Sequence, residues 1–200
     1  MNSIQQLHGC GAGRRLLIIG RGNSVLDFRF DLLPDDVDTM AVNEQRLEMT
    51  KYGYDIIPTF MIYMDLCEKE FIEKNGLIDG LILIAPKSTA CARVDYIFDE
   101  TDVVLNGSTT VYYALQIAEK MGYAAAYLIG VDMKPSATGR IRYLGDDKIN
   151  ATHRKEYIEK DFKNMISCFD KFAWSMPIFN CNPDSELKKF PYSVPWEAVA

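Results

Sequence analysis

The chain has 200 residues, of which 48% are hydrophobic and 25% are charged, and its formal net charge is −6. This length and composition predict one domain with a substantial hydrophobic core. The acidic balance argues against a protein that wraps duplex nucleic acid, while leaving room for a local basic pocket that holds one nucleotide.

Membrane, disulfide and metal signals are weak throughout the sequence. No apolar run approaches the roughly 20 residues that cross a bilayer, so we expect no transmembrane segment. The five cysteines are scattered without a CxxC pair and there are only two histidines, which indicates reduced thiols and offers no zinc site. The hydrophobic region of a signal peptide is also lacking. We therefore expect a soluble, cytoplasmic protein that binds no metal.

Short apolar runs predict a series of strands along the chain. Residues 1–14 are expected to form a flexible leader, and the first strand follows in "RLLIIG". In chain order, strands are predicted at residues 15–20, 39–43, 59–65, 81–86, 102–106, 126–132 and 177–182. These runs are nearly continuous rather than alternating, which is typical of strands covered on both faces.

Two stretches between these runs have helical spacing. Apolar residues recur at intervals of three and four from Val111 to Met121, and Gly122 ends that pattern. A second stripe is formed by Ile158, Phe162, Met165, Phe169 and Phe172. The fold class is therefore α/β. We predict a single Rossmann-like domain at 15–192, with a mostly parallel sheet of about seven strands, helices on both faces, and a C-terminal tail at 193–200.

Polar residues follow five of the predicted strands, at the edge of the sheet where ligands of parallel sheets bind. In chain order these residues are Gly20, Arg21, Gly22, Asn23, Ser24, Asn43, Asp65, Asn106, Gly107, Ser108, Thr109, Thr110 and Asp132. We expect them to form one binding site.

The turn "GRGNS" after the first strand is a candidate phosphate cradle. Its glycines let the backbone approach a ligand closely, Asn23 or Ser24 can cap the following segment, and Arg21 adds positive charge. The turn matches neither the dinucleotide fingerprint nor a Walker A loop. A plain tight turn with an exposed arginine is the alternative interpretation.

The helix after "LNGS" provides a second candidate element. Ser108 is predicted as its N-cap, and Thr109 and Thr110 add hydroxyls where the helix dipole is positive. Capping alone explains one hydroxyl, whereas three in succession after Asn106 suggest a ligand.

Two further residues have a functional and a structural interpretation. His153 precedes the second helix and has a side chain suited to general acid or base catalysis near neutral pH, although an exposed histidine at a helix start explains it equally well. Asp132 is either a ligand-binding carboxylate or a residue that hydrogen-bonds loop backbone. The polar segment 134–150 lies between them, and its length is compatible with a lid.

Taken in order, five segments resemble one known family. They are "LLIIGRGNSVLD", "DTMAVNE", "NGSTTVYYALQIAEKMGYAAAYLIGVDM", "THRKEYIE" and "IFNCNPDSELKKFP". This succession resembles the bacterial sialyltransferases of glycosyltransferase family 42, and also related short proteins of the DUF115 type, over roughly residues 15–192. The resemblance implies a Rossmann-like domain that transfers sialic acid from CMP-sialic acid without a metal.

The resemblance also implies roles for particular residues. Those implied to approach the nucleotide phosphate are Gly20, Gly22 and Ser24. Asn43 would touch the nucleotide or donor sugar, and Ser108 and Thr109 would lie in the cytidine-binding turn. His153 would be the general base, and Tyr143 would assist the phosphate leaving group.

Three positions depart from the family pattern. Arg21 stands where the family usually has asparagine, Lys134 where a leaving-group tyrosine is expected, and Asn106 where an arginine is usual. The resemblance therefore implies the fold and a nucleotide-type ligand more strongly than the sialyl donor.

Two other functions remain open on the same fold. Some DUF115 relatives are diphosphokinases that use ATP and magnesium, and Asp65 and Asp132 could hold that ion. Alternatively, the chain is a non-catalytic nucleotide-binding or assembly protein, with its C-terminal tail as a docking segment. The favoured interpretation is a transferase that uses a nucleotide sugar, with a nucleotide or nucleotide-sugar partner and homo-oligomers as a further expectation.

Overall fold

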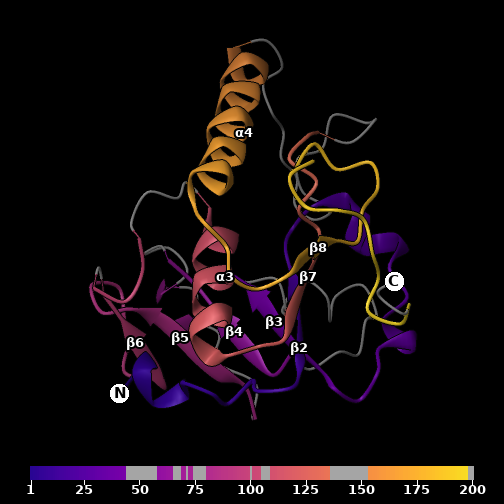
Figure 1. Cartoon of the computed structure of the whole chain (residues 1–200). Coiled ribbons are helices and arrows are strands. Elements are labelled where there is room, and N and C mark those ends of the chain that lie inside the picture. Colours follow the sequence, from indigo (N-terminus) through magenta and orange to yellow (C-terminus); the bar gives the residue numbers. More distant parts are fainter. Residues whose placement is uncertain are drawn as a thin grey trace.

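The computed structural model of the protein describes most of the chain. The described residues are 1–43, 58–64, 69–70, 72–73, 80–99, 101–104, 109–135 and 153–197, with the side chains of the last range described from residue 159 onward. Within these ranges, eight strands form one sheet in the order β1-β6-β5-β4-β3-β2-β7-β8 (Figure 1). Every neighbouring pair is parallel. The predicted single Rossmann-like domain with a parallel sheet is confirmed.

The strands are β1 (Asn2–Ser3), β2 (Arg15–Ile19), β3 (Val37–Val42), β4 (Phe60–Ile62), β5 (Ile82–Pro86), β6 (Tyr96–Phe98), β7 (Ala125–Ile129) and β8 (Ile178–Asn180). The central strand β2 shows why continuous apolar runs form these elements. The side chains from Leu16 to Ile19 alternate between the two faces, yet all of them are fully buried. Both faces of the sheet are therefore covered.

One predicted strand is wrong. Residues 101–104 of the run expected at 102–106 form a turn, and residues 105–106 lie outside the described residues. Asp102 makes this turn, because its backbone N–H donates to Asp99 O at 3.0 Å and its carboxylate accepts the Asp99 N–H at 3.1 Å. The strand beside β5 is instead β6, a run of three residues between acidic residues that apolar patterning alone does not reveal.

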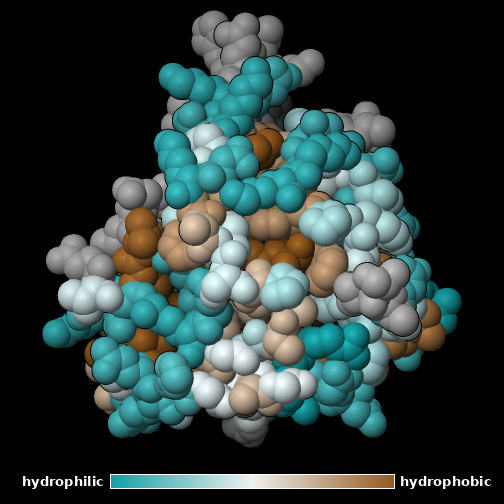
Figure 2. All heavy atoms as spheres, viewed as in Figure 1, coloured by the Kyte–Doolittle hydropathy of each residue, from teal (hydrophilic) through white to brown (hydrophobic). Residues whose placement is uncertain are grey.

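Two described helices cover one face of the sheet. Helix α3 (Thr110–Met121) ends at Gly122, whose φ of 80° provides the left-handed cap that the sequence predicts. Helix α4 (His153–Lys171) packs Phe169 against Tyr112 of α3, with ring centroids 5.8 Å apart. Figure 1 shows the first turns of α4 standing well beyond the sheet. Figure 2 shows hydrophilic residues over the described part of α4 and hydrophobic residues gathered below it.

The opposite face has a mixed covering. Below β4 and β5 lies the helical residue Ile72, which is fully buried and belongs to the same cluster as Leu83. Below β2 and β7 lie the 3-10 helices η2 (Asn23–Asp27) and η3 (Phe30–Leu32) and the C-terminal tail. Helices thus cover both faces as predicted, with the tail completing the second one.

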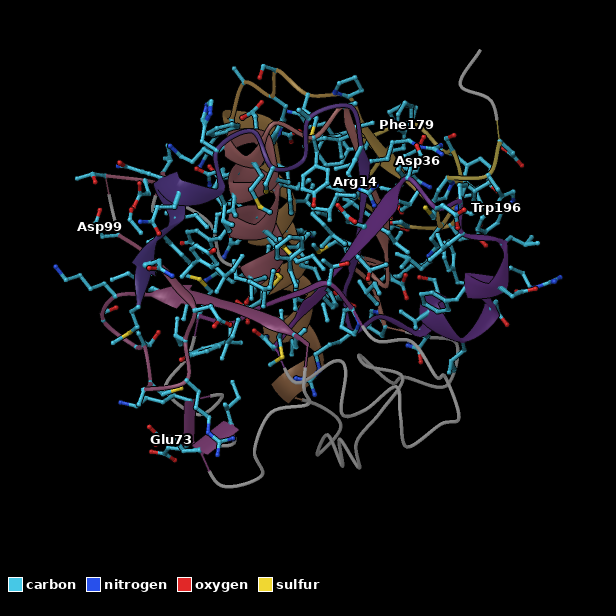
Figure 3. The ribbon with its side chains drawn as sticks, turned by 90° about the horizontal axis from the view of Figure 1, so that it is seen from below. Arg14, Asp36, Glu73, Asp99, Phe179 and Trp196 are labelled. Carbon is cyan, nitrogen blue, oxygen red and sulfur yellow. The ribbon has the colours of Figure 1, made fainter. Side chains whose placement is uncertain are left out.

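The C-terminal tail packs closely on this second face. Val194 is 4% exposed, and the ring of Trp196 lies 5.1 Å from that of Phe28 (Figure 3). Arg15 donates through Nη1 to the carbonyl of Pro195 at 2.5 Å. The described part of the tail, up to residue 197, is therefore an integral layer of the domain.

The first fourteen residues also differ from the expected flexible leader. Strand β1 pairs with β6, and the 3-10 helix η1 (Ile4–Leu7) buries Ile4 and Leu7 in the main core. The Gly11 N–H donates to Met121 O at 2.9 Å. This segment extends the sheet beside β6 and packs against the C-terminal end of α3, so it is part of the domain.

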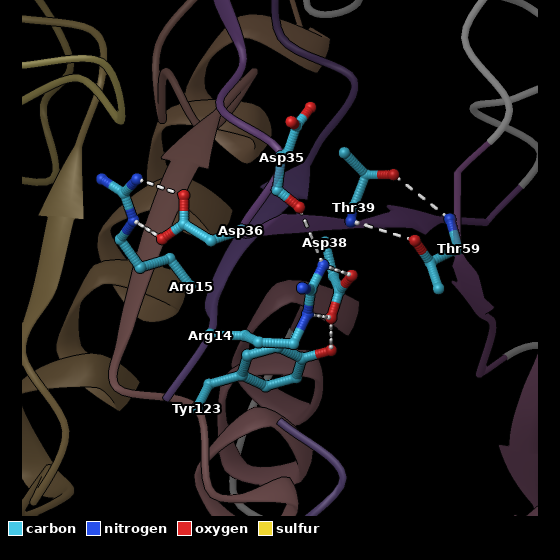
Figure 4. A network of polar contacts seen from close by, with 8 residues as sticks. All are labelled: Arg14, Arg15, Asp35, Asp36, Asp38, Thr39, Thr59 and Tyr123. Atoms are coloured by element: carbon cyan, nitrogen blue, oxygen red, sulfur yellow. Dashed lines mark hydrogen bonds and ion pairs between the residues drawn. The ribbon is translucent and has the colours of Figure 1, made fainter. Parts of the chain in front are cut away.

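A polar network joins the amino ends of β2 and β3 (Figure 4). Arg14 donates to both carboxylate oxygens of Asp38, at 2.9 and 2.6 Å, and the Tyr123 hydroxyl donates to Asp38 at 2.8 Å. Burial acts to raise the pKa of Asp38, but these hydrogen bonds outweigh it and the pKa is lowered. The network lies at the sheet edge opposite the predicted site, so it serves stability.

Candidate functional site

A cavity of about 320 Å³ lies where β2, β3 and β7 end and α3 begins. Since β3 lies on one side of β2 and β7 on the other, this is the point at which the strand order reverses, where open α/β sheets bind ligands. Helix α4 contributes Phe162 and Met165 to the wall. The predicted site residues that line the cavity are Gly20, Arg21, Gly22, Asn43, Thr109, Thr110 and Asp132.

The loops after β2 and β7 interlock beneath this cavity. The Gly20 N–H donates to Ile129 O and the Gly22 N–H to Gly130 O, both at 2.7 Å. A Cβ atom on Gly22 would lie 2.6 Å from Oδ2 of Asp132, and one on Gly20 would collide with the carbonyl of Gly130. These glycines are therefore required by the contact between the two loops, whatever ligand the cavity takes.

Asp132 is the centre of that contact. Its Oδ1 accepts hydrogen bonds from the Ser24 hydroxyl at 2.5 Å and the Asn182 amide at 2.8 Å, while Oδ2 accepts the Ser24 N–H at 3.0 Å. The Ser24 hydroxyl in turn accepts the Gly130 N–H at 3.1 Å. Both carboxylate oxygens thus have donors within the chain, as the structural interpretation of Asp132 requires.

Asn43 and Thr110 form the opposite wall. Asn43 has a φ of 57°, which is an uncommon backbone conformation for a residue other than glycine. Its Oδ1 accepts the Thr110 hydroxyl at 3.1 Å, so the amide nitrogen is presented as a donor. A strained, polar residue at the end of a strand is a frequent mark of a binding site.

Helix α3 begins one residue later than the sequence predicts. Thr109 is its N-cap, with φ −144° and ψ 140°, and its side chain makes no capping hydrogen bond. Ser108, the predicted cap, lies outside the described residues, as do Asn106 and Gly107. The positive end of α3 therefore points its first turn at the cavity through Thr110 and Val111.

Two basic side chains line the cavity, Arg21 and Lys134. Lys134 lies 3.9 Å from the carboxylate of Glu186, and the two side chains are 40% and 54% exposed. An ion pair this long and this exposed contributes little to stability. Because the acidic residue of the lining, Asp132, is hydrogen-bonded on both oxygens, the described lining favours an anionic ligand.

Neither predicted catalytic residue is among the described residues that line the cavity. Tyr143 lies outside the described residues, as does Asp65. His153 is the first residue of α4, nine positions before Phe162, which at about 1.5 Å per residue corresponds to roughly 14 Å of helix. Asn23 opens η2 next to Ser24 and is not part of the cavity wall.

The segment "NPDSEL" at 182–187 has a structural role that was not predicted. In the structure it supports the loop after β7: the Ser185 hydroxyl donates to Val131 O at 2.7 Å and the Glu186 N–H to Asp132 O at 2.9 Å. Leu187 anchors the segment in the core at 1% exposure. The sequence signals for this role are the place of the segment in the family resemblance and its position directly after β8, the strand beside β7.

A second cavity, of about 700 Å³, lies along the last turns of α3. None of the predicted site residues lines it. Its polar groups are largely engaged, since Gln116 accepts the Val104 N–H at 2.7 Å and Glu119 accepts that of Ser175 at 2.5 Å. Among the described residues no group of three or more His, Cys, Asp or Glu side chains is placed to hold a metal ion, and no helix could span a membrane.

The chain matches no protein-family model and no curated protein. Its fold does match solved structures. CstII from Campylobacter jejuni, a sialyltransferase solved with cytidine-5′-monophosphate, aligns with a TM-score of 0.56 and 15% identity, over 94% of this chain and 88% of that chain. An apo α-2,3-sialyltransferase from the same organism aligns with a TM-score of 0.52 and 18% identity, over 92% and 81%.

A Maf glycosyltransferase from Magnetospirillum magneticum AMB-1 aligns with a TM-score of 0.58 and 12% identity, over 96% of this chain and 35% of that chain. These likenesses establish a fold shared with sialyltransferases and with part of a larger glycosyltransferase. The Rossmann-like fold that the sequence resemblance implies is thus confirmed.

Proposed function

We propose that the chain is a glycosyltransferase-like enzyme that binds a nucleotide sugar, with CMP-linked donors foremost, and transfers the sugar to an acceptor hydroxyl. The observation that carries the proposal is the 320 Å³ cavity, in which three strand ends and the start of α3 meet. The chain shares its fold with a sialyltransferase solved with cytidine-5′-monophosphate. The transferred sugar is proposed to be sialic-acid-like.

Within this proposal the cavity residues have different roles. Asn43 and the first turn of α3 hold the nucleotide, with Ser108 and its neighbours completing the cytidine-binding turn. Arg21 lies beside the phosphate, where positive charge stabilises a departing phosphate better than it stabilises the intact donor. The interlocked Gly22 and Ser24 shape the floor.

His153 is the proposed general base, which accepts the proton of the acceptor hydroxyl as the new glycosidic bond forms. Tyr143 is proposed to donate to the leaving phosphate, so no metal is required. Because His153 begins α4 roughly 14 Å along the helix axis from Phe162, this role requires the start of α4 to approach the cavity when both substrates bind.

Thermal unfolding with a panel of nucleotides tests the binding part of the proposal. CMP, CDP, UDP, GDP, AMP and ATP are each added with and without Mg²⁺. A ligand at a hundred times its dissociation constant adds about 2.7 kcal/mol of stability, which is readily measured. We expect stabilisation by CMP without a metal. Stabilisation by ATP only with Mg²⁺ would favour a diphosphokinase instead, although the engaged carboxylate of Asp132 disfavours it as an ion ligand.

The His153→Ala variant tests the catalytic part. We expect turnover of a CMP-sugar to fall by about 10²–10⁴-fold, as for loss of a general base, with CMP affinity retained. The His8→Ala variant is the matched control and should keep full activity. Equal loss of turnover and CMP affinity in His153→Ala would reject the assignment, and binding without turnover of any donor would favour a non-catalytic protein.

A further inference from the structure

The described side chains that line the cavity carry more positive than negative charge. Two of its described lining side chains are cationic, Arg21 and Lys134, and one is anionic, Asp132. The anionic group is hydrogen-bonded by Ser24 on both oxygens and by Asn182 on one. Hydrogen bonds of this kind stabilise a carboxylate and disperse its charge inside the chain. Among the described lining side chains, cationic groups therefore outnumber anionic ones.

The loop that carries Lys134 is held in an unusual conformation. Within five residues it contains two positive φ angles, 71° at Gly130 and 53° at Met133. The second belongs to a side chain that is only 8% exposed. A left-handed residue other than glycine costs free energy and persists only where its surroundings enforce it.

The surroundings that enforce it are the segment Asn182–Leu187. Its Ser185 hydroxyl and Glu186 N–H bind the carbonyls of Val131 and Asp132, the two residues directly before Met133. The Leu187 N–H donates to the Ser185 hydroxyl at 3.1 Å, which fixes that hydroxyl in turn. The chain thus keeps a strained turn that returns Lys134 to the cavity rim.

We propose that Lys134 contacts a phosphate of the ligand, and that Glu186 is the counter-ion that this phosphate replaces. The inference rests on the proposed function for the identity of the ligand as a nucleotide. The pair at 3.9 Å between exposed side chains is weak, whereas an ammonium–phosphate contact in a cavity is a charge-assisted hydrogen bond of greater strength. Exchange of Glu186 for phosphate is therefore favourable.

Titration calorimetry with CMP and with cytidine, which lacks the phosphate, isolates this contact. In the wild-type protein CMP should bind more tightly than cytidine. In Lys134→Met the affinity for CMP should fall by about tenfold or more, as expected for loss of a hydrogen bond to a charged group, with the affinity for cytidine unchanged. Lys134→Arg should retain most of the preference for CMP. Glu186→Gln should raise the affinity for CMP.

Lys120→Met is the matched control. It removes the same charge from the last turn of α3, ten residues and about 15 Å along the helix from Thr110. We expect no change in either affinity. If Lys134→Met folds with wild-type circular dichroism and keeps the wild-type preference for CMP over cytidine, the inference is overturned while the proposed function stands.

If the wild-type protein binds no nucleotide, the proposed function fails and inorganic pyrophosphate becomes the probe. Thermal stabilisation by pyrophosphate that Lys134→Met loses and Lys120→Met keeps would still support an anion-binding Lys134. No stabilisation, or equal stabilisation of both variants, would overturn the inference as well.

Discussion

The Ser24 hydroxyl donates a hydrogen bond of 2.5 Å to Oδ1 of Asp132, a residue 108 positions further along the chain. The same hydroxyl accepts the Gly130 N–H. One side chain from the loop after β2 thereby satisfies both the backbone and the carboxylate of the loop after β7. The floor of the cavity depends on this contact.

Ser24→Ala should lower the free energy of unfolding by about 1–3 kcal/mol, because it leaves the buried Gly130 N–H without its partner and removes one of the two donors to Oδ1 of Asp132. Urea unfolding of the purified variant measures the loss. Ser167→Ala is the control, since that hydroxyl donates to Asn164 O within α4 at an exposed position and should change stability by less than about 0.5 kcal/mol. Equal stability of both variants would show that the loops do not depend on Ser24.

Gly20→Ala should prevent the two loops from closing, since the added Cβ collides with the carbonyl of Gly130. We expect a loss of at least about 3 kcal/mol or failure to fold, as for severe steric strain. Gly80→Ala provides the contrast: φ is 84° there, but nothing lies within 4 Å of the added atom, so only about 1–2 kcal/mol of backbone strain is expected. Thermal unfolding of the two variants side by side tests this ranking.

The Asn43→Gly variant separates the backbone strain at this position from the role of the side chain in ligand binding. Glycine adopts the φ of 57° without penalty, while the hydrogen bond from Thr110 is lost. We expect stability within about 1 kcal/mol of wild type and a CMP affinity reduced by about tenfold or more. Calorimetric unfolding and CMP titration on the same sample provide both numbers. A stable variant with unchanged CMP affinity would remove Asn43 from the binding site.

The lowered pKa of Asp38 predicts that the folded protein loses stability in acid. Its pKa in the folded protein lies below the ordinary value of 3.8 because of Arg14 and Tyr123, despite burial acting the other way. A depressed folded pKa contributes stability that is present above the unfolded pKa and lost as the pH falls through the folded one. Urea unfolding from pH 6 to pH 2 should show this loss below about pH 4, and Asp38→Asn should show a smaller one. An identical pH profile for the variant would contradict the assignment.

Trp196→Ala tests the tail as a structural layer. The ring packs on Phe28 and is partly buried in the cluster below β2 and β7, so its removal should cost about 1–3 kcal/mol, less than for a fully buried tryptophan. Thermal unfolding reports the loss. Tyr192→Ala is the control, because that ring is 53% exposed. A tail that serves only as a docking segment would leave the stability of Trp196→Ala unchanged.

Apolar patterning and strand ends predict most of this fold. Strands β2 to β5, β7 and β8 overlap predicted runs because they are buried on both faces, although β3 and β7 begin before their runs, and α3 ends at Gly122 as its sequence indicates. Two neighbouring strands at one side of the sheet were not predicted, β1 and β6, which are two and three residues long. β1 consists of two polar residues, and β6 is bounded by Asp95 and Asp99, so no longer apolar run marks either strand and only pairing with a neighbour defines them.

The site is predicted in part for the same reason. Because the carboxyl ends of parallel strands share one edge, residues as distant as Gly20 and Asp132 could be placed together from the order of strands alone. The hydrogen bonds among Ser24, Asn182 and Asp132 could not be predicted, since these residues meet through loop conformations that no local pattern encodes. The turn at Met133 could not be predicted for the same reason. A positive φ at a methionine contradicts the local preference of that residue and is enforced by contacts from outside the loop.

The position of β2 between two parallel neighbours also affects how the chain folds during its synthesis. Arg15 pairs with Val37 of β3 on one side and with Ala125 of β7 on the other. At roughly 5–20 residues per second of synthesis, the second partner emerges from the ribosome several seconds after the first. Throughout that interval one edge of a strand that is apolar from Leu16 to Ile19 is unpaired, and the protein is then most prone to aggregation and most in need of a chaperone.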